Sequence, residues 1–133
     1  MNFKRKTGSH GFTLIEMMVV ISLILILLSI ALPMYNRSIQ NARETVFRSN
    51  LATLNKVISQ YTLDKNKAPL TLDDLVQAKY LKSVPPDITG SPDTWVPEME
   101  DSLQAVDQSQ PGMVGVHSGS DQIGSNGTAY STW

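Results

Sequence analysis

One carboxylate stands alone in a long apolar run. Glu16 is the single charged residue between Phe12 and Leu32. A charged side chain in the hydrocarbon of a membrane costs about 2.5–3.5 kcal/mol on insertion scales, so an intramembrane acid needs a partner. Glu16 is therefore the residue whose chemistry has to be explained first.

The rest of the chain offers little catalytic chemistry. It has two histidines and no cysteine. His10 precedes the apolar run, which leaves His117 as the only histidine after it. A zinc site, or a nucleophile activated by histidine, needs more ligands or partners than one such residue. We therefore expect no enzymatic activity, and no motif here resembles a phosphate-binding loop.

Charges are distributed unevenly along the chain. Bases at 4–6 precede the apolar run, and six more lie between Arg37 and Lys67. After Lys82 there is no Lys or Arg, whereas seven Asp and Glu residues occur there. An acidic region without bases lacks the positive surface that binds nucleic acid, so we expect no nucleic-acid partner.

The apolar run, 12–32, is long enough to cross a bilayer, since about 21 residues span about 32 Å as a helix. The bases at 4–6 predict a cytoplasmic N-terminus. A plain membrane anchor would leave Glu16 unexplained. A secretory signal peptide, cleaved near Ser29-Ile30-Ala31, would have an unusually long apolar region. A third interpretation rests on a resemblance.

The sequence G-F-T-L-I-E at 11–16 resembles the processing site of type IV pilins and of the pseudopilins of type II secretion systems. The resemblance implies that a prepilin peptidase cuts after Gly11 and that Phe12 becomes N-methylated. It also implies that Glu16 pairs with the new Phe12 amine of a neighbouring subunit during assembly. The family more often has a base where this chain has His10.

An amphipathic helix is predicted to continue through 35–66, because this stretch has no Gly or Pro and ends near Asp64. Its bases either are solvated or meet the acidic heads of neighbouring subunits. Pro33 is expected to kink the long helix, as it lacks an N–H group. Apolar residues at three- and four-residue steps predict the face that covers the head: Ile39, Ala42, Val46, Leu51, Leu54, Ile58 and Tyr61.

The last 67 residues are expected to form a small head. Thr71 and Asp74 have the spacing of a capping box, which predicts a short helix that Pro85-Pro86 ends. Trp133 is expected to pack on the head as an anchor. Two strands and a tight turn are also predicted: Thr94–Val96, Gly112–His117 and Asn126-Gly127.

The head resembles that of the major pseudopilin of type II secretion systems. Ala78-Lys79 replaces that family's usual glycine before the tyrosine. The resemblance also implies calcium in the C-terminal loop, where Asp121 is the expected ligand, although 118–130 holds only this carboxylate. The matching residues are Leu72, Leu75, Tyr80, Leu81, Lys82, Pro85 or Pro86, Asp87, Gly90 and Pro92.

Together these features predict an α+β pilin fold, in which a long kinked helix packs on a head with a short helix and a small antiparallel sheet. The predicted segments are a cleaved leader (1–11), a transmembrane half-helix that forms the filament core (12–34), an amphipathic half-helix (35–66) and the head (67–133). Calcium is the one cofactor that the resemblance implies.

The predicted function is that of a structural subunit, the major pseudopilin, which polymerises into a filament spanning the periplasm. A type IV pilus subunit for adhesion, motility or DNA uptake is the alternative, and a monomeric membrane-anchored binding module is the outside option. Expected partners are further copies of the chain, the prepilin peptidase, minor pseudopilins and an inner-membrane platform with a cytoplasmic ATPase. The expected location is the bacterial inner membrane, crossed once, and then a periplasmic or cell-surface filament.

Overall fold

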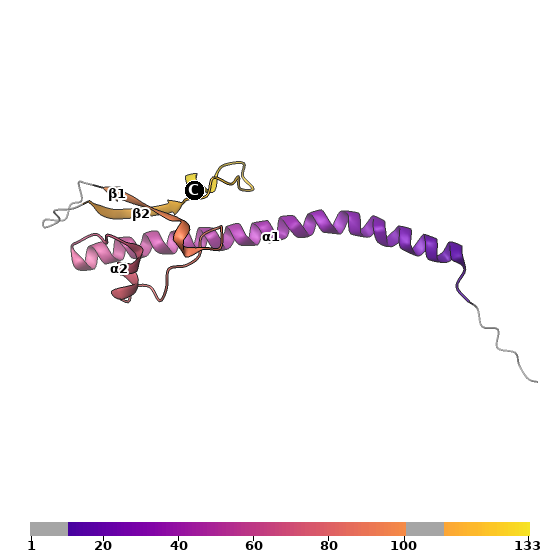
Figure 1. Ribbon diagram of the computed structural model, residues 1–133, viewed down its shortest axis with the longest axis horizontal. Helices are drawn as coiled ribbons and strands as arrows, with labels where there is room; N and C mark the ends of the chain where they lie inside the picture. The colour runs from indigo at the N-terminus through magenta and orange to yellow at the C-terminus, as the bar shows by residue number, and fades with distance from the viewer. Residues whose placement is uncertain (1–10, 101–110) are drawn as a thin grey trace, which may run out of the picture. The chain divides into compact units, whose positions relative to one another are not determined.

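A computed structural model describes residues 11–100 and 111–133, so most of the predicted leader lies outside the described residues (Figure 1). The chain forms two compact units, one up to Ser38 and one from Ile39 to Trp133. The elements are α1 (Leu14–Lys65), α2 (Leu72–Gln77), β1 (Trp95–Glu100) and β2 (Gly112–Ser118), with short 3₁₀ helices at Pro92–Thr94 and Tyr130–Thr132. The predicted α+β fold, a long helix with a small head, is confirmed.

Helix α1 is 52 residues long and ends at Lys65, one residue beyond the predicted end. It ends there because Asn66 adopts a left-handed conformation, with φ 49°, which Asn tolerates better than most residues. The helix continues through Pro33, whose missing N–H cannot donate to the carbonyl of Ser29. The bend expected at Pro33 stays a prediction.

The core of the second unit is built on α1. Helix residues Phe47, Leu54, Val57 and Ile58 are buried, with exposed fractions of 8% or less. They pack against buried residues of the head: Leu75, Trp95, Met113, Val116 and Tyr130. Because these head residues come from α2, from both strands and from the 3₁₀ helix at Tyr130–Thr132, the helix α1 is the surface on which the head assembles.

An aromatic cluster surrounds Phe47. Its ring stacks on Trp95 at 5.7 Å between centroids and meets the edge of Tyr130 at 5.7 Å. Trp133 lies 5.9 Å from Phe47 and also contacts Tyr130, which confirms the prediction that it packs on the head. Gly124 is required beside this cluster, because a Cβ there would lie 2.5 Å from the Trp133 ring.

The prediction of which α1 residues face the head is only partly confirmed. Leu51, Leu54, Ile58 and Tyr61 belong to the core or pack against it. The prediction was wrong for Ile39, Ala42 and Val46, which are exposed, because Phe47 rather than Val46 starts the buried row. Adjacent helix residues differ by about 100° around the axis, so residues aligned with Val46 turn away from the head.

Helix α2 begins as predicted and ends earlier than predicted. The Thr71 side chain accepts from the Asp74 N–H and the Asp74 carboxylate accepts from the Thr71 N–H, which completes the capping box. The helix ends at Gln77, not at Pro85-Pro86. Lys79 takes a left-handed conformation with φ 63°, and the N–H groups of Tyr80 and Lys79 donate to the carbonyls of Leu75 and Val76. These bonds define a Schellman motif.

Strands β1 and β2 form a two-stranded antiparallel sheet and confirm both predicted strands. Pro97 lies opposite Val116, whose N–H points to α1 rather than to β1. The missing N–H of Pro97 therefore costs the ladder nothing, as expected for an edge strand. A register shift between Glu98 and Met99 marks a β-bulge. The turn predicted at Asn126-Gly127 is confirmed, with the Gly127 N–H donating to the Gly124 carbonyl.

Replacing Lys79 with glycine is expected to stabilise the head. A left-handed conformation costs a residue with a Cβ about 1–2 kcal/mol that glycine does not incur. Lys79→Gly should therefore raise the thermal unfolding midpoint of the full chain in detergent, followed by the fluorescence of Trp95 and Trp133. Lys79→Ala is the matched control, since it keeps the Cβ. Equal midpoints for the two variants would show that the backbone at 79 is not strained.

Candidate assembly site

The N-terminal end of α1 is capped by Thr13. The N–H groups of Glu16 and Met17 donate to the Thr13 carbonyl at 3.1 and 3.2 Å, and the Glu16 N–H also reaches Thr13 Oγ1 at 3.3 Å. Thr13 and Glu16 thus have the T-x-x-E spacing of a capping box, in which the bond to the Thr13 side chain is formed. Glu16 has a local role at the positive end of the helix dipole besides the role in assembly that the sequence predicted.

The processing site is fully accessible in this unit. Gly11, Phe12 and Thr13 precede the helix without regular structure, and Phe12 is 73% exposed. The predicted cleavage site therefore lies just before the helix, and Glu16 lies in its first turn. The roles assigned to Gly11, Phe12, Glu16 and Pro33 stay predictions, because no partner chain is present.

The apolar half of α1 is uncovered. Every residue from 11 to 38 is exposed, including Leu14 at 81% and Leu27 at 68%. The helix is long and apolar enough to cross a membrane, with a mean hydropathy of 2.8 over its most apolar 18 residues. Monomeric soluble proteins rarely expose so continuous an apolar surface. Lipid or other apolar helices must cover it.

A second carboxylate, Glu44, is buried in the head unit with an exposed fraction of 4%. Its Oε1 accepts from the Ser125 N–H at 2.7 Å, the Tyr130 hydroxyl at 2.9 Å and the Gln40 amide at 3.2 Å. The Ser125 hydroxyl donates to Oε2. Glu44 therefore fastens the C-terminal segment to α1 with three hydrogen bonds, and Gln40 of α1 itself donates the fourth. No cation of the described residues forms an ion pair with it.

These bonds govern the protonation of Glu44. Burial alone would raise its pKa, but the hydrogen bonds from Ser125, Tyr130 and Gln40 outweigh that effect and lower the pKa below its ordinary value of 4.5. Burial and the bond to Glu44 raise the pKa of Tyr130, which keeps its hydroxyl protonated as a donor. Glu44 was not predicted from the sequence, in which the available signal was an acid four residues from Gln40 and three from Phe47.

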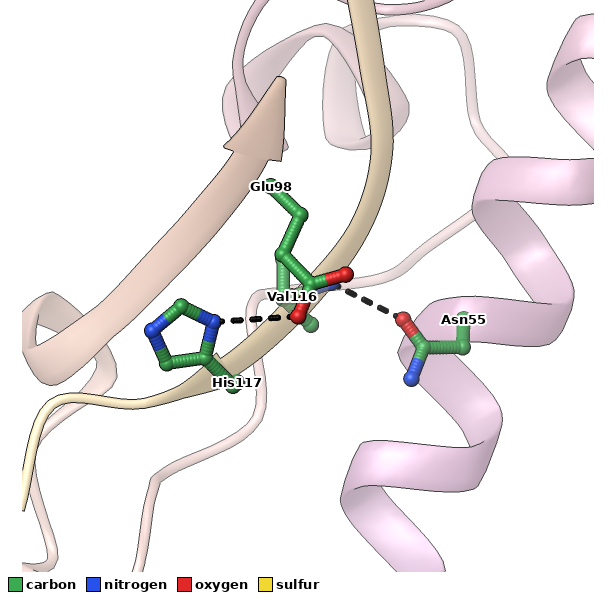
Figure 2. A network of polar contacts seen from close by, with 4 residues as sticks. All are labelled: Asn55, Glu98, Val116 and His117. Carbon is green, nitrogen blue, oxygen red and sulfur yellow. Dashed lines mark hydrogen bonds and ion pairs between the residues drawn. The ribbon is translucent and has the colours of Figure 1, made fainter. Parts of the chain in front are cut away.

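A polar network ties β2 to α1 (Figure 2). Asn55 Oδ1 accepts from the Val116 N–H at 2.9 Å. A side chain of α1 therefore satisfies a backbone N–H of β2 that does not point to β1. Glu98 Oε1 lies 3.2 Å from Nδ1 of His117 on the neighbouring strand. Gly115 leaves room for both groups, because a Cβ there would lie 3.2 Å from Asn55 and from Glu98. His117 therefore acts in strand pairing here.

Asp121, the residue expected to bind calcium, is exposed and accepts from the Ser131 hydroxyl at 3.0 Å. Across residues 11–100 and 111–133, no three His, Cys, Asp or Glu side chains come together in a way that could hold a metal ion. Backbone carbonyls and hydroxyls are the remaining oxygen ligands near Asp121. Calcium binding there stays a prediction.

Residues 6–32 match the family described as "Prokaryotic N-terminal methylation motif". The chain is 33% identical over 72 residues to "Competence protein ComGC" of Halalkalibacterium halodurans, an alignment that covers 54% of this chain and 71% of the relative. It is 32% identical over 104 residues to "Type II secretion system core protein G" of Aeromonas hydrophila, covering 66% of this chain and 73% of the relative. No solved structure gives a significant match.

A protein of the same name from Klebsiella michiganensis is 34% identical over 85 residues, covering 62% of this chain and 58% of the relative. With these relatives, the motif at 6–32 and the long helix with a small head, the chain belongs to the type IV pilin-like family. It is a pseudopilin- or pilin-like structural subunit. Membership implies polymerisation and processing by a prepilin peptidase, and the motif and apolar helix indicate membrane anchoring.

Protonating or removing the Glu44 carboxylate is expected to destabilise the head. Because the folded-state pKa is lowered, the carboxylate adds stability above pH 4.5, and this stability is lost as pH falls through the folded-state value. Glu44→Gln should cost about 1–3 kcal/mol at pH 7, because an amide donor replaces one acceptor among four donors.

Thermal unfolding of the full chain in detergent between pH 7 and pH 3 would measure both effects. Glu98→Gln is the matched control, because Glu98 is 55% exposed at its side chain. The wild-type protein should lose more stability on acidification than Glu44→Gln. If the stability of the wild-type protein and that of Glu44→Gln fall equally steeply with pH, the role assigned to Glu44 is contradicted.

Proposed function

We propose that this chain is the major pseudopilin of a type II secretion system. The observation that carries the proposal is the 104-residue alignment with a core protein G, which is too long to be confined to the N-terminal motif and must include part of the head. The exposed apolar half of α1 supports polymerisation, because a bundle of such helices would replace lipid around residues 12–34. A cytoplasmic ATPase would supply the work of extraction.

The proposed assembly step uses Glu16. Cleavage after Gly11 leaves a positive amine on Phe12, and methylation keeps that amine basic. Glu16 of one copy pairs with this amine on a neighbour, which fixes the register of the two helices. Removing one partner of a buried ion pair typically costs about 3–5 kcal/mol, because the other charge is left uncompensated.

A competence or type IV pilus subunit is the second candidate. The observation that favours it is the match to "Competence protein ComGC", which covers 71% of that relative. Deleting the gene would separate the two functions, because loss of secreted enzymes indicates the pseudopilin and loss of surface pili or of DNA uptake indicates the alternative.

Removing the Glu16 carboxylate is expected to abolish filaments. Glu16→Val should still be inserted in the membrane and cleaved, but should give no filaments by electron microscopy of overexpressing cells. Glu16→Gln is the informative control, since it keeps the side-chain shape and loses only the charge. Normal filaments from both variants would contradict the pairing with Phe12.

Mass spectrometry of the purified native protein should find Phe12 at its N-terminus, carrying one added methyl group. An N-terminus at Met1 or at Leu32 would contradict the proposed processing. The first would indicate an uncleaved anchor, and the second a secretory signal peptide.

A further inference from the structure

One face of α1 in the head unit is left uncovered by the head. Ile39, Ala42, Arg43 and Val46, here called the stem strip, follow each other at steps of three, one and three residues and so share one face of the helix. Ile39 is 38% exposed and Val46 is 58% exposed. The stem strip therefore combines apolar surface with one base.

Ala42, Arg43 and Val46 of the stem strip form one wall of a groove of about 440 Å³, together with Phe47, and the loop 86–90 forms the other wall. Ile39 lies outside this groove. The loop is fixed on α1, because the Asn50 amide donates to the Pro86 carbonyl at 2.9 Å. The Asp87 carboxylate in this loop is buried and accepts from Ser118 and Thr94 at 2.7 and 2.8 Å. The charge that the groove offers to a ligand is therefore that of Arg43.

Arg43 has no acidic partner in the part of the chain that the structure describes. The ion pair found there joins His117 and Glu98, and no carboxylate of residues 11–100 or 111–133 lies within 4 Å of Arg43. Among the same residues, Glu100 on β1 has no cationic partner either. Within the described residues, Arg43 on α1 and Glu100 on β1 are therefore both left without an oppositely charged partner.

Strand β1 carries the complementary surface. Its residues 96–100, here called the β1 edge, combine two exposed apolar side chains with two acids. Val96 is 39% exposed and Met99 is 47% exposed. In the described chain the sheet has two strands, so the outer side of β1 has no strand beside it. Pro97 has no N–H to donate to a further strand, so this edge is left to contact a second chain through its side chains.

We propose that the β1 edge of one copy docks into the stem groove of a second copy, with Glu100 facing Arg43. Val96 lies on the same face of β1 as Glu100, because side chains alternate along a strand, and it then covers Val46, so apolar surface and opposite charge match together. Glu100 is the partner rather than Glu98, because Glu98 already contacts His117. The inference rests on the proposed polymerisation and specifies which head surface meets which helix face.

Cysteine cross-linking in cells tests the contact directly, because the chain has no cysteine of its own. Arg43→Cys and Glu100→Cys in one full-length chain should give a ladder of disulfide-linked multimers. Ala52→Cys with Glu100→Cys is the matched control, because Ala52 is exposed on α1 but lies outside the groove. An equal ladder from both pairs, or none from the first, would overturn the inference.

A charge exchange tests the proposed ion pair. Arg43→Glu and Glu100→Arg should each reduce filament yield about tenfold, as close interfacial charge pairs often contribute that much, and the double variant should recover most of it. The alternative result is that Asp73→Arg or Asp93→Arg restores the filament yield of the Arg43→Glu variant while Glu100→Arg does not. That result would show that another acid faces Arg43, and it would overturn the assignment to β1.

Filament formation by the wild-type chain distinguishes a failure of the docking inference from a failure of the proposed function. If it forms filaments but neither the cross-link nor the charge exchange behaves as expected, the docking inference fails and the proposed function stands. If it forms no filaments when the assembly machinery is present, the proposed function fails and the docking inference fails with it.

Discussion

The head depends on the face that α1 presents to it. Beyond α1 the described residues form one six-residue helix, two strands and two short 3₁₀ helices, which are too little to enclose a core by themselves. The helix closes this core with Phe47, Leu54 and Ile58, and the Trp95, Tyr130 and Trp133 rings gather around Phe47. The helix that carries the long apolar run therefore also contributes more buried core residues than any other element.

Two buried carboxylates complete this arrangement without disulfides. Glu44 holds the C-terminal loop, and Asp87 holds the loop 86–90 against β2. Both are satisfied by hydroxyl and backbone donors, as buried acids must be when no cation is near. Since these acids are engaged inside the head, the contact proposed between copies uses the exposed Arg43 of α1 and the exposed Glu100 of β1.

The sequence by itself determined the features that depend on neighbours along the chain. The long apolar run after Gly11, the capping of α1 by the Thr13 side chain and the capping box of α2 are set by residues within a few positions. The strands and the Asn126-Gly127 turn are local in the same way. Such patterns are readable because helix caps and turns form from short-range hydrogen bonds.

Only the tertiary structure decided which surfaces meet. It placed Phe47 rather than Val46 in the core and ended α2 at a left-handed Lys79. It also buried Glu44, whose partners Ser125 and Tyr130 lie 81 and 86 residues further along the chain. Periodicity shows that a helix has an apolar face. When two apolar residues such as Val46 and Phe47 lie about 100° apart around the helix, the shape of the segments that pack on the helix decides which of them is buried. An acid's burial likewise depends on donors that come close only when the chain folds.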